Sequence, residues 1–259
     1  MASIIDGEKL ATAKEAVLKQ QVPPGLKLAI LAFKADRAGQ VYSRLKEEAG
    51  KRVGIEVARF NYEWQETELI REKILELNAD QSWTGIMIQR PGYRGEKFEK
   101  EWIQLVNAIV PSKDVDGLRV DSPFVPATVR AVENIPFRNG MTLRSGMKGK
   151  KIVIVGRGMV GKKLKERLRG ENISSRDKDL AKKTKQAEVL ICCSGREKLI
   201  KKEMVKLGAM VIDVGWPKGD VDFDEVVKVA GVITPVPGGV GPLTVVCLLE
   251  NLMEAVYNS

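Results

Sequence analysis

One stretch decides the fold of this chain: Lys151-Ile-Val-Ile-Val-Gly-Arg-Gly-Met-Val-Gly161. Its apolar first half, Lys151–Val155, predicts a buried strand, and the residues from Val160 to Arg169 predict a helix. The three glycines have the G-x-G-x-x-G spacing. In that motif the first glycine makes a tight turn, the second lets a pyrophosphate approach, and the third lets helix and strand pack closely. The context favours dinucleotide binding at the helix N-terminus, with a purely structural turn as the alternative.

The rest of the chain repeats this alternation of strand and helix. Apolar strand-like runs alternate with amphipathic stretches from start to finish, which predicts α/β architecture. Strands are expected at 26–33, 55–60, 85–89, 151–155, 172–175, 189–193, 210–214 and 231–234. Helices are expected at 7–20, 40–53, 67–77, 98–108, 126–134, 160–169, 179–185 and 245–257. Residues 139–150 are rich in Gly, Lys and Ser and are expected to form a loop.

The composition excludes several kinds of chemistry. Histidine is absent from all 259 residues, which excludes Ser-His-Asp and Cys-His catalysis and any His-ligated metal site. The Cys and carboxylate spacings match no metal-binding pattern, so no metal is expected. Acid–base work must therefore fall to Lys, Asp, Glu, Tyr or Cys.

The net charge of +9 allows a polyanionic partner. The excess is scattered over Lys-rich helices and no basic run is interleaved with aromatics, so a nucleic-acid-binding face is the less favoured interpretation. A phosphate-bearing cofactor or an acidic substrate would use the same charge.

The cysteines and the hydropathy pattern bear on location. Cys192, Cys193 and Cys247 all lie in apolar surroundings, which fits buried thiols in a reducing compartment. No run approaches the roughly 18 apolar residues of a membrane helix, and the N-terminus lacks the pattern of a signal peptide. We expect a cytoplasmic protein that does not enter a membrane.

The residues about 20 positions beyond the first glycine of the motif bear on cofactor choice. A Rossmann protein that uses NAD usually places an acidic residue there to hold the ribose 2′-OH. Here the zone reads Ser174-Ser175-Arg176-Asp177. Arg176 and the hydroxyls can receive a 2′-phosphate, which favours NADP, whereas Asp177 leaves NAD possible. The alternative is that Arg176 is a solvated loop charge.

The first half of the chain offers candidate catalytic residues. Tyr42 and Lys46 stand four apart on a predicted helix and share one face. A partly desolvated Lys beside an aromatic ring can have a lowered pKa and serve as acid or base, although such pairs are also common on surfaces. Gln89 ends a predicted strand, where α/β sheets form their ligand crevice. Asp114-Val-Asp116-Gly117 is either a binding segment or an Asx turn.

A second glycine-rich segment, Thr234-Pro-Val-Pro-Gly-Gly-Val-Gly-Pro-Leu-Thr244, follows the apolar pair Val232-Ile233. Prolines fix φ and remove N–H donors, while glycines allow φ > 0 and a close approach to a ligand. The segment is either a tight strand-to-helix connection or a cradle of fixed shape for a flat or phosphorylated ligand.

Together these pieces resemble the bifunctional methylenetetrahydrofolate dehydrogenase/cyclohydrolase family over nearly the whole chain. The matching segments are Tyr42-x-x-x-Lys46, Gly85-Ile-Met-Ile-Gln89-x-Pro91, Lys113-Asp-Val-Asp-Gly117, Gly156-Arg-Gly-x-Val-Gly161, Gly208-Ala-x-Val-Ile-Asp-Val-Gly215, Gly219-Asp-Val-Asp-Phe223 and Thr234-Pro-Val-Pro-Gly-Gly-Val-Gly-Pro242. The last of these is long and specific, and its combination with Lys-Asp-Val-Asp-Gly is hard to explain by chance.

The resemblance implies NADP-dependent oxidation of 5,10-methylenetetrahydrofolate and hydrolysis of the methenyl product to 10-formyltetrahydrofolate. It implies Lys46 as the key catalytic residue, Tyr42 stacked on the aminobenzoyl ring, Gln89 bonded near Lys46, and Asp116 on the pterin. Pro237, Gly238, Gly239 and Val240 would lie against folate and nicotinamide. The residues expected at the cofactor are Gly156, Arg157, Gly158, Val160, Gly161, Ser175, Arg176 and Thr234.

The resemblance also implies two domains and a homodimer. Residues 1–119 and 243–259 would form an N-terminal α/β folate and catalytic domain, to which the last helix returns. Residues 120–242 would form a Rossmann-type dinucleotide-binding domain with a parallel sheet.

The chain departs from the family pattern at several points. Gln-Leu-Pro-Leu-Pro becomes Gln89-Arg-Pro-Gly-Tyr93, Pro-Cys-Thr-Pro becomes Pro126-Ala-Thr-Val129, and Gly-Arg-Ser becomes Gly156-Arg-Gly158. The stretch from the glycine turn to Arg176 is several residues short. These changes leave open a second hypothesis, a folate- or nucleotide-binding homologue in which one activity, the dehydrogenase first, is weakened or lost.

Overall fold

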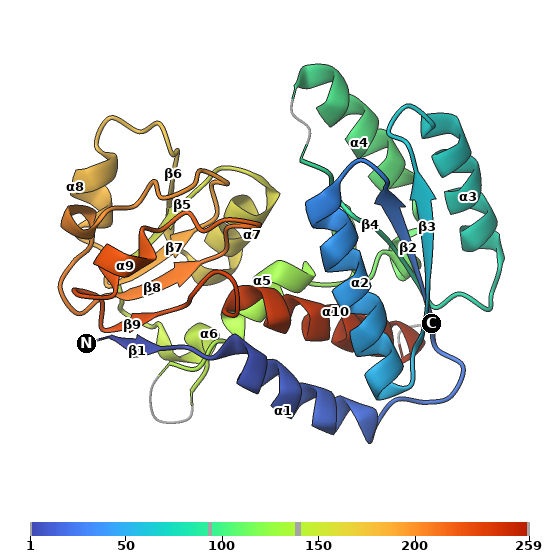
Figure 1. The fold of residues 1–259 in the computed structure, drawn as a ribbon, viewed down its shortest axis with the longest axis horizontal. Helices are drawn as coiled ribbons and strands as arrows, with labels where there is room; N and C mark the ends of the chain where they lie inside the picture. The colour runs from blue at the N-terminus through green and yellow to red at the C-terminus, as the bar shows by residue number, and fades with distance from the viewer. Residues whose placement is uncertain (1, 93–94, 138–140, 258–259) are drawn as a thin grey trace. The chain divides into compact units, whose positions relative to one another are not determined.

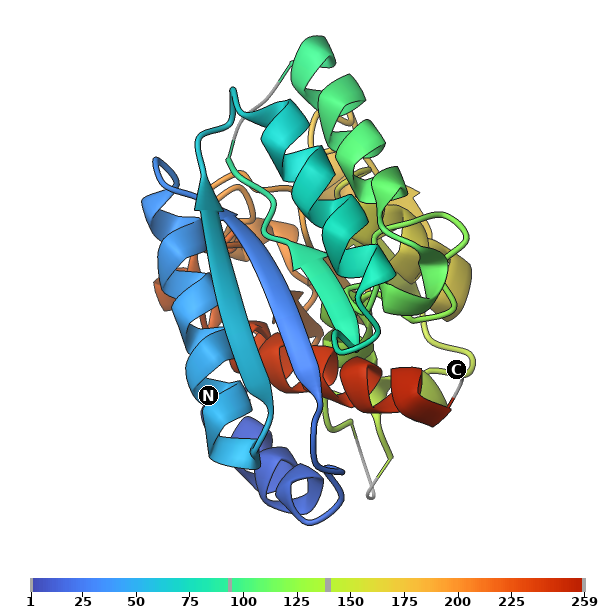
Figure 2. The same cartoon turned by 90° about the vertical axis from the view of Figure 1, so that its right-hand side faces the viewer.

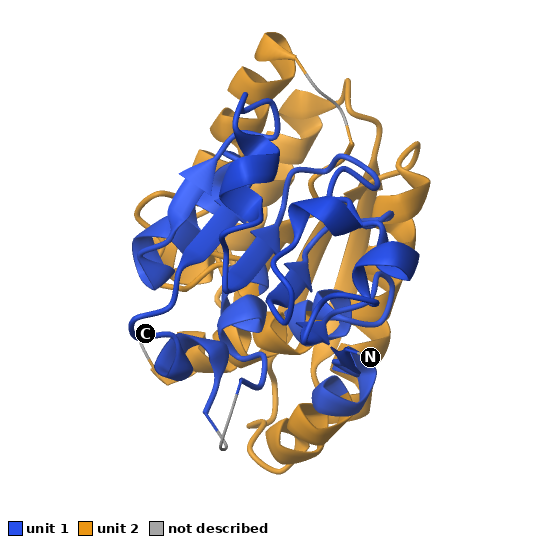
Figure 3. Ribbon diagram, turned by 90° about the vertical axis from the view of Figure 1, so that its left-hand side faces the viewer, with its two compact units in different colours: residues 1–11, 128–244 blue, residues 12–127, 245–259 orange. Residues whose placement is uncertain are grey.

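The computed structural model describes residues 2–92, 95–137 and 141–257 (Figure 1). Tyr93 of the altered Gln-Arg-Pro-Gly-Tyr segment and the start of the predicted 139–150 loop lie outside these ranges. The chain divides into two compact units: unit 1 holds residues 1–11 and 128–244, and unit 2 holds residues 12–127 and 245–259 (Figure 3). The predicted domain boundaries differ from these units at residues 1–11, 120–127 and 243–244. Residues 1–11 group with unit 1, where a short strand pairs with its sheet.

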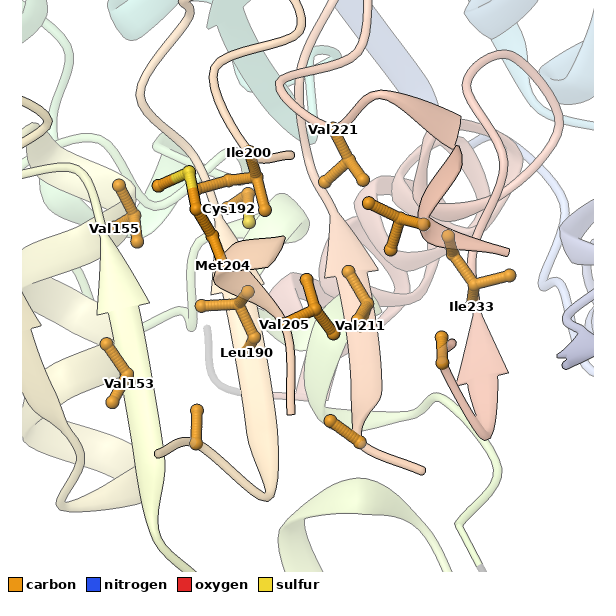
Figure 4. Close-up of a cluster of buried hydrophobic side chains, with 14 of the residues drawn as sticks. Val153, Val155, Leu190, Cys192, Ile200, Met204, Val205, Val211, Val221 and Ile233 are labelled. Carbon is orange, nitrogen blue, oxygen red and sulfur yellow. The ribbon is translucent and has the colours of Figure 1, made fainter. Parts of the chain in front are cut away.

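Unit 1 is built on a six-stranded parallel sheet in the order β1-β9-β8-β7-β5-β6. Its strands are β1 (Ser3–Ile4), β5 (Ile152–Val155), β6 (Glu171–Ile173), β7 (Val189–Cys192), β8 (Met210–Asp213) and β9 (Val232–Ile233). The predicted strand at 172–175 is therefore shifted toward the N-terminus. Side chains of one face, among them Val153, Leu190 and Val211, form a buried apolar cluster (Figure 4). Such continuous apolar strands are typical of parallel sheets buried on both faces.

The helices of unit 1 are short. They are α6 (Leu143–Gly146), α7 (Met159–Leu168), α8 (Leu180–Thr184) and α9 (Phe223–Val226), with the 3₁₀ turn η2 (Lys202–Met204). The prediction of a loop over 139–150 is wrong where α6 forms, because Thr142 and Ser145 make a reciprocal capping box. Helix α7 ends at Arg169, which has a left-handed φ of 55°.

Unit 2 contains a three-stranded parallel sheet in the order β3-β2-β4. Its strands are β2 (Lys27–Phe33), β3 (Glu56–Tyr62) and β4 (Gly85–Ile88), and its helices include α2 (Arg37–Val53), α3 (Thr67–Ala79), α4 (Glu96–Ala108) and the 3₁₀ turn η1 (Pro111–Lys113). Figure 2 shows α3 and α4 side by side over one face of the sheet, where their apolar side chains pack with Ile86 and Ile88. Met87 points to the opposite face, since side chains alternate along a strand, and there it meets Lys46 of α2.

Three helices contain the unit boundaries: α1 (Gly7–Lys19), α5 (Ala127–Glu133) and α10 (Val240–Tyr257). Helix α10 begins five residues earlier than predicted, because Pro242 falls in its first turn, where the missing N–H has no helical partner to lose. Among the described residues α10 alone has the length and apolar composition of a membrane span, contrary to the expected absence of such a run, but 67% of it is buried within the protein, as is usual for a core helix.

Candidate functional site

Helix α2 places Lys46 in the interior of unit 2. Its side chain is only 3% exposed, and its Nζ lies 4.6 Å from the centroid of the Tyr42 ring. Tyr42 is half-buried one helical turn earlier. The four-residue spacing on one helix thus brings the two side chains together.

A second contact to Lys46 comes from the carboxyl end of β4. Gln89 is the first residue after this strand, and its backbone N–H donates to the Leu31 carbonyl at 2.8 Å, which continues the ladder. The Lys46 Nζ donates to Gln89 Oε1 at 3.0 Å and approaches Met87 Sδ at 3.4 Å. The ammonium is therefore held between an amide oxygen, a thioether and an aromatic ring.

The Lys-Asp-Val-Asp-Gly segment is fixed by its first two residues. Lys113 donates to the carbonyls of Leu77, Asn78 and Asp80 at 2.8–3.0 Å, at the end of α3. Asp114 is buried, and it accepts the N–H groups of the residues four and five positions later. A parallel bridge between Ile86 and Asp114 sets this segment beside β4. This anchoring positions Asp116, which is half-buried.

Lys46 and Asp116 influence each other's protonation. Burial lowers the pKa of Lys46 to about 8, and the Asp116 carboxylate limits that shift. Burial likewise raises the pKa of Asp116 to about 6; the charge of Lys46 opposes the rise and that of Asp114 adds to it. Near neutral pH both groups are charged, yet each lies within about a unit of its titration point. Such poised values suit proton transfer.

The nucleotide motif has the expected local geometry in unit 1. A Cβ at Gly156 would lie 2.4 Å from the Cys193 carbonyl oxygen, and Gly156 has a φ of 127°. A Cβ at Gly161 would lie 1.9 Å from the Gly156 carbonyl oxygen, whereas a Cβ at Gly158, the N-cap of α7, would meet no atom within 4 Å. The first and third glycines are required by packing, and the second has open surroundings, as the close approach of a pyrophosphate in this motif requires. Arg157 is exposed beside it and Val160 is half-buried.

The turn after β6 contains Asp177, the acidic residue of the Ser174–Asp177 segment. Asp177 accepts the N–H of Asp179 and the Nζ of Lys183, both at 2.9 Å, and the bond from Lys183 lowers the pKa of Asp177. Its carboxylate is therefore engaged within the turn. Arg176 is exposed and Ser175 is half-buried in the same turn.

The Pro-Gly segment forms the loop between β9 and α10. Thr234 is buried, and its Oγ1 accepts the Asp213 N–H at 2.8 Å. The peptide bond before Pro237 is cis, Gly238 has a φ of 94°, and its carbonyl accepts the Gly7 N–H at 2.8 Å. Gly239 packs too tightly on Pro235 for any Cβ, and Val240 is the buried first residue of α10. The loop is a strand-to-helix connection of fixed shape.

The predicted residues thus fall into two groups. Tyr42, Lys46, Gln89 and Asp116 belong to unit 2, and the predicted cofactor and loop residues belong to unit 1. Sequence reasoning gave no role to Met87, or to the buried carboxylates Asp213 and Asp220, although their motifs were quoted. Among the described residues no three His, Cys, Asp or Glu side chains gather as a metal site.

Comparison with known proteins identifies the family. Residues 5–116 match the family model for the catalytic domain of tetrahydrofolate dehydrogenase/cyclohydrolase, and residues 126–259 match that for its NAD(P)-binding domain. The bifunctional protein FolD of Pelagibacter ubique is 35% identical over 289 residues, covering 99% of each chain. That of Listeria innocua is 36% identical over 289 residues, covering 98% of this chain and 97% of its own.

Solved structures agree. The methylenetetrahydrofolate dehydrogenase-cyclohydrolase (FolD) of Trypanosoma brucei, solved with NADP and an inhibitor, has a TM-score of 0.86 at 28% identity, covering 99% of this chain and 98% of that one. The silkworm 5,10-methylenetetrahydrofolate dehydrogenase has a TM-score of 0.83 at 32% identity, covering 100% and 99%. The predicted α/β fold is confirmed, and this chain belongs to the tetrahydrofolate dehydrogenase/cyclohydrolase family.

Proposed function

We propose that this protein oxidises 5,10-methylenetetrahydrofolate to 5,10-methenyltetrahydrofolate with NADP and then hydrolyses the product to 10-formyltetrahydrofolate. In the first reaction the methylene carbon loses a hydride, and the product is a methenyl cation. In the second, water adds to that carbon, a C–N bond of the ring opens and a proton is released. The observation that carries the proposal is the buried Lys46 ammonium, held 3.0 Å from Gln89 and 4.6 Å from the Tyr42 ring.

Lys46 has the properties that the hydrolytic step needs. A lysine with a pKa of about 8 exists in both protonation states near neutral pH, so it can take a proton from the attacking water and return it to solvent. Gln89 Oε1 holds Nζ in place and cannot itself become charged. The negative charge of Asp116 suits a cationic substrate. A protein without histidine can therefore manage this proton transfer.

The oxidative step relies on binding and orientation. When bound, NADP supplies the acceptor for the hydride that leaves the folate. The residues that would hold it are those of the glycine turn and the Ser174–Asp177 turn, where Gly158 leaves open space and Arg157 and Arg176 are exposed. Asp177 is already engaged by Lys183, which favours a 2′-phosphate over a free 2′-OH and thus NADP over NAD. Thr234 and the loop to Val240 would fix the nicotinamide end, where about 1 Å of misplacement can cost ~100-fold in rate.

The setting of the reaction is part of the proposal. Cys192, Cys193 and Cys247 form no disulfide, which supports action in the reducing cytoplasm. The family resemblance supports a homodimer and a role for the 10-formyl product as a one-carbon donor for purine biosynthesis.

One assay tests the proposal. Methylenetetrahydrofolate is supplied with NADP or NAD, and the reduced cofactor and methenyl product are followed separately. We expect turnover with NADP to exceed that with NAD, and added methenyltetrahydrofolate to be hydrolysed without cofactor. Folded protein that turns over with neither cofactor has no dehydrogenase activity. Hydrolysis alone would favour the second candidate, a homologue with the redox step lost, for which the ten-residue α7 is the motivating observation.

A further inference from the structure

Two buried carboxylates lie at the carboxyl edge of the unit 1 sheet. Asp213, which ends β8, is 3% exposed, and Asp220 in the following loop is 0% exposed. Among the described residues neither has a Lys or Arg within ion-pair distance. Burial raises the pKa of both groups, and the charge of Asp220 raises that of Asp213 further. Two carboxylates that lie this close without a cation are costly to bury. The hydrogen bonds that they accept must therefore offset this cost.

Asp213 connects the loops after β8 and β9. Its Oδ1 accepts the N–H groups of Gly215 at 2.9 Å and Asp220 at 3.0 Å, and its Oδ2 accepts that of Val221 at 2.9 Å. Its own N–H donates to Thr234 Oγ1 at 2.8 Å. The start of the Pro-Gly loop is therefore tied to the loop that contains Asp220.

Asp220 extends this network to the loop after β7. Its Oδ2 accepts the N–H groups of Ser194 and Gly195, the latter at 3.2 Å, and its Oδ1 accepts that of Arg196 at 3.0 Å. The exposed Arg196 side chain then donates from Nη1 to the Ser175 carbonyl at 2.9 Å. Ser175 belongs to the turn after β6 that carries Arg176.

The network therefore spans the carboxyl edge of the unit 1 sheet, where we propose that NADP binds. It runs from Thr234, at the nicotinamide end, to the Ser174–Asp177 turn, at the 2′-phosphate end. In the sheet β5 lies between β7 and β6, so the bond from Arg196 to Ser175 crosses beside the glycine turn that follows β5. Within this network of described residues, Asp220 alone joins the loops after β8 and β9 to the loops after β7 and β6.

We propose that Asp220 is a positioning residue that, through Asp213 on one side and Arg196 on the other, holds the loops after β6, β7, β8 and β9 in the shape that binds both ends of NADP. This inference rests on the proposed NADP-dependent function. Among the described residues the Asp220 carboxylate bonds to backbone N–H groups and to the Ser194 side chain, so its role is to order the N–H groups and carbonyls around the ligand before binding, which lowers the entropic cost of binding.

The test is a nucleotide-binding measurement on the full chain. Calorimetry gives the Kd of NADP and of 2′,5′-ADP for the wild type, Asp220→Asn, Arg196→Met and Asp222→Asn. In Asp220→Asn an amide NH2 group replaces one carboxylate oxygen, so a donor faces a buried N–H that has lost its acceptor. We therefore expect the NADP affinity of this variant to be at least tenfold weaker. Arg196→Met should weaken 2′,5′-ADP binding about threefold or more without a change in melting temperature.

Asp222→Asn is the matched control. Asp222 lies two residues further along the same loop but pairs with Lys201 at 2.9 Å and Lys198 at 3.5 Å, and the Asp222→Asn variant should bind NADP as the wild type does. Hydrolysis of methenyltetrahydrofolate, which uses no nucleotide, should keep its wild-type rate in Asp222→Asn and Arg196→Met, whose replaced side chains make no bond to the Pro-Gly loop among the described residues. Circular dichroism and the melting temperature report on the folding of Asp220→Asn, and a loss of NADP affinity that only accompanies unfolding would overturn the inference.

The outcomes separate this inference from the proposed function. A wild type that binds no NADP refutes the proposed function itself. A wild type that binds NADP, beside a folded Asp220→Asn that binds it equally well, refutes the positioning role. If Asp220→Asn does not fold, the surface variant Arg196→Met decides, and unchanged 2′,5′-ADP binding there counts against the network.

Discussion

Replacing Lys46 by Met should stabilise the protein at neutral pH while removing the group to which we assign the proton transfer of the proposed hydrolysis. Lys46 is 3% exposed, and burial lowers its pKa from 10.5 to about 8. The ammonium is therefore harder to hold in the folded state than in the unfolded one. Methionine has a similar length and no charge, so it can occupy the same space without that cost.

The size of the effect follows from the pKa shift. Each unit is about 1.4 kcal/mol, so a fall from 10.5 to about 8 corresponds to about 3 kcal/mol of unfavourable burial below pH 8. Loss of the 3.0 Å bond to Gln89 offsets about 1 kcal/mol of this. The expected net stabilisation at pH 7 is about 2 kcal/mol.

The sign of the pH dependence is fixed by the same shift. Between pH 8 and 10.5 the unfolded state binds more protons at Lys46 than the folded state does, so wild-type stability rises with pH in this window. The Met variant lacks that rise. Its advantage should therefore be largest below pH 8 and about 1 kcal/mol smaller at pH 9 than at pH 7.

Urea unfolding at pH 7 and pH 9 measures the difference. Tryptophan fluorescence reports mainly on the correct unit, since Trp64, Trp83 and Trp102 lie in unit 2 and the fourth tryptophan, Trp216, lies in unit 1. Lys51→Met on the same helix is the control, because Lys51 is 67% exposed and its replacement should change stability by less than about 0.5 kcal/mol at either pH. A Lys46→Met variant that is less stable than the wild type at pH 7, or an advantage that does not shrink at pH 9, would refute the reasoning.

Three further predictions follow from the two sites. Asp116→Asn removes the charge that supports the Lys46 ammonium, so the pH profile of hydrolysis should shift to lower pH by up to about one unit; an unshifted profile would contradict the coupling. Arg176→Ala should weaken NADP binding about tenfold and leave NAD binding nearly unchanged, as measured by the two Kd values. Gly161→Ala, whose Cβ would lie 1.9 Å from a carbonyl oxygen, should destabilise unit 1 by several kcal/mol, whereas Gly158→Ala should melt like the wild type but bind NADP more weakly.

Local pattern was sufficient for the parts of the site that depend on one element. Tyr42 and Lys46 meet because four residues make about one helical turn, and that spacing is visible in the sequence. Gln89 could be placed because the carboxyl ends of parallel strands line one edge of a sheet. The glycine turn was predictable because the G-x-G-x-x-G spacing lies within one strand–turn–helix segment of the sequence.

Other parts depend on contacts between segments far apart in the chain. Nothing in the sequence distinguishes Met87 from other apolar strand residues. Its contact with Lys46 arises only because α2 covers the face of the sheet to which Met87 points. The short β1 exists only because β9 offers it a partner, and two residues are too few for a strand pattern. Asp213 lies at the end of a predicted strand and Asp220 follows it without a predicted element, and only the fold shows that both are buried and accept N–H groups from the loops after β7 and β8.

The absence of histidine makes the Lys46–Asp116 pair informative about how this protein transfers protons. An exposed lysine and an exposed aspartate differ in pKa by more than six units, and neither titrates near neutral pH. Burial moves the two values toward each other, to about 8 and about 6. The mutual attraction of the two charges limits both shifts, so the pair stays ionised at pH 7 and does not neutralise. A cationic substrate entering such a site would repel the ammonium and attract the carboxylate. Both effects favour loss of the Lys46 proton when the methenyl cation is bound, which is when a base is needed.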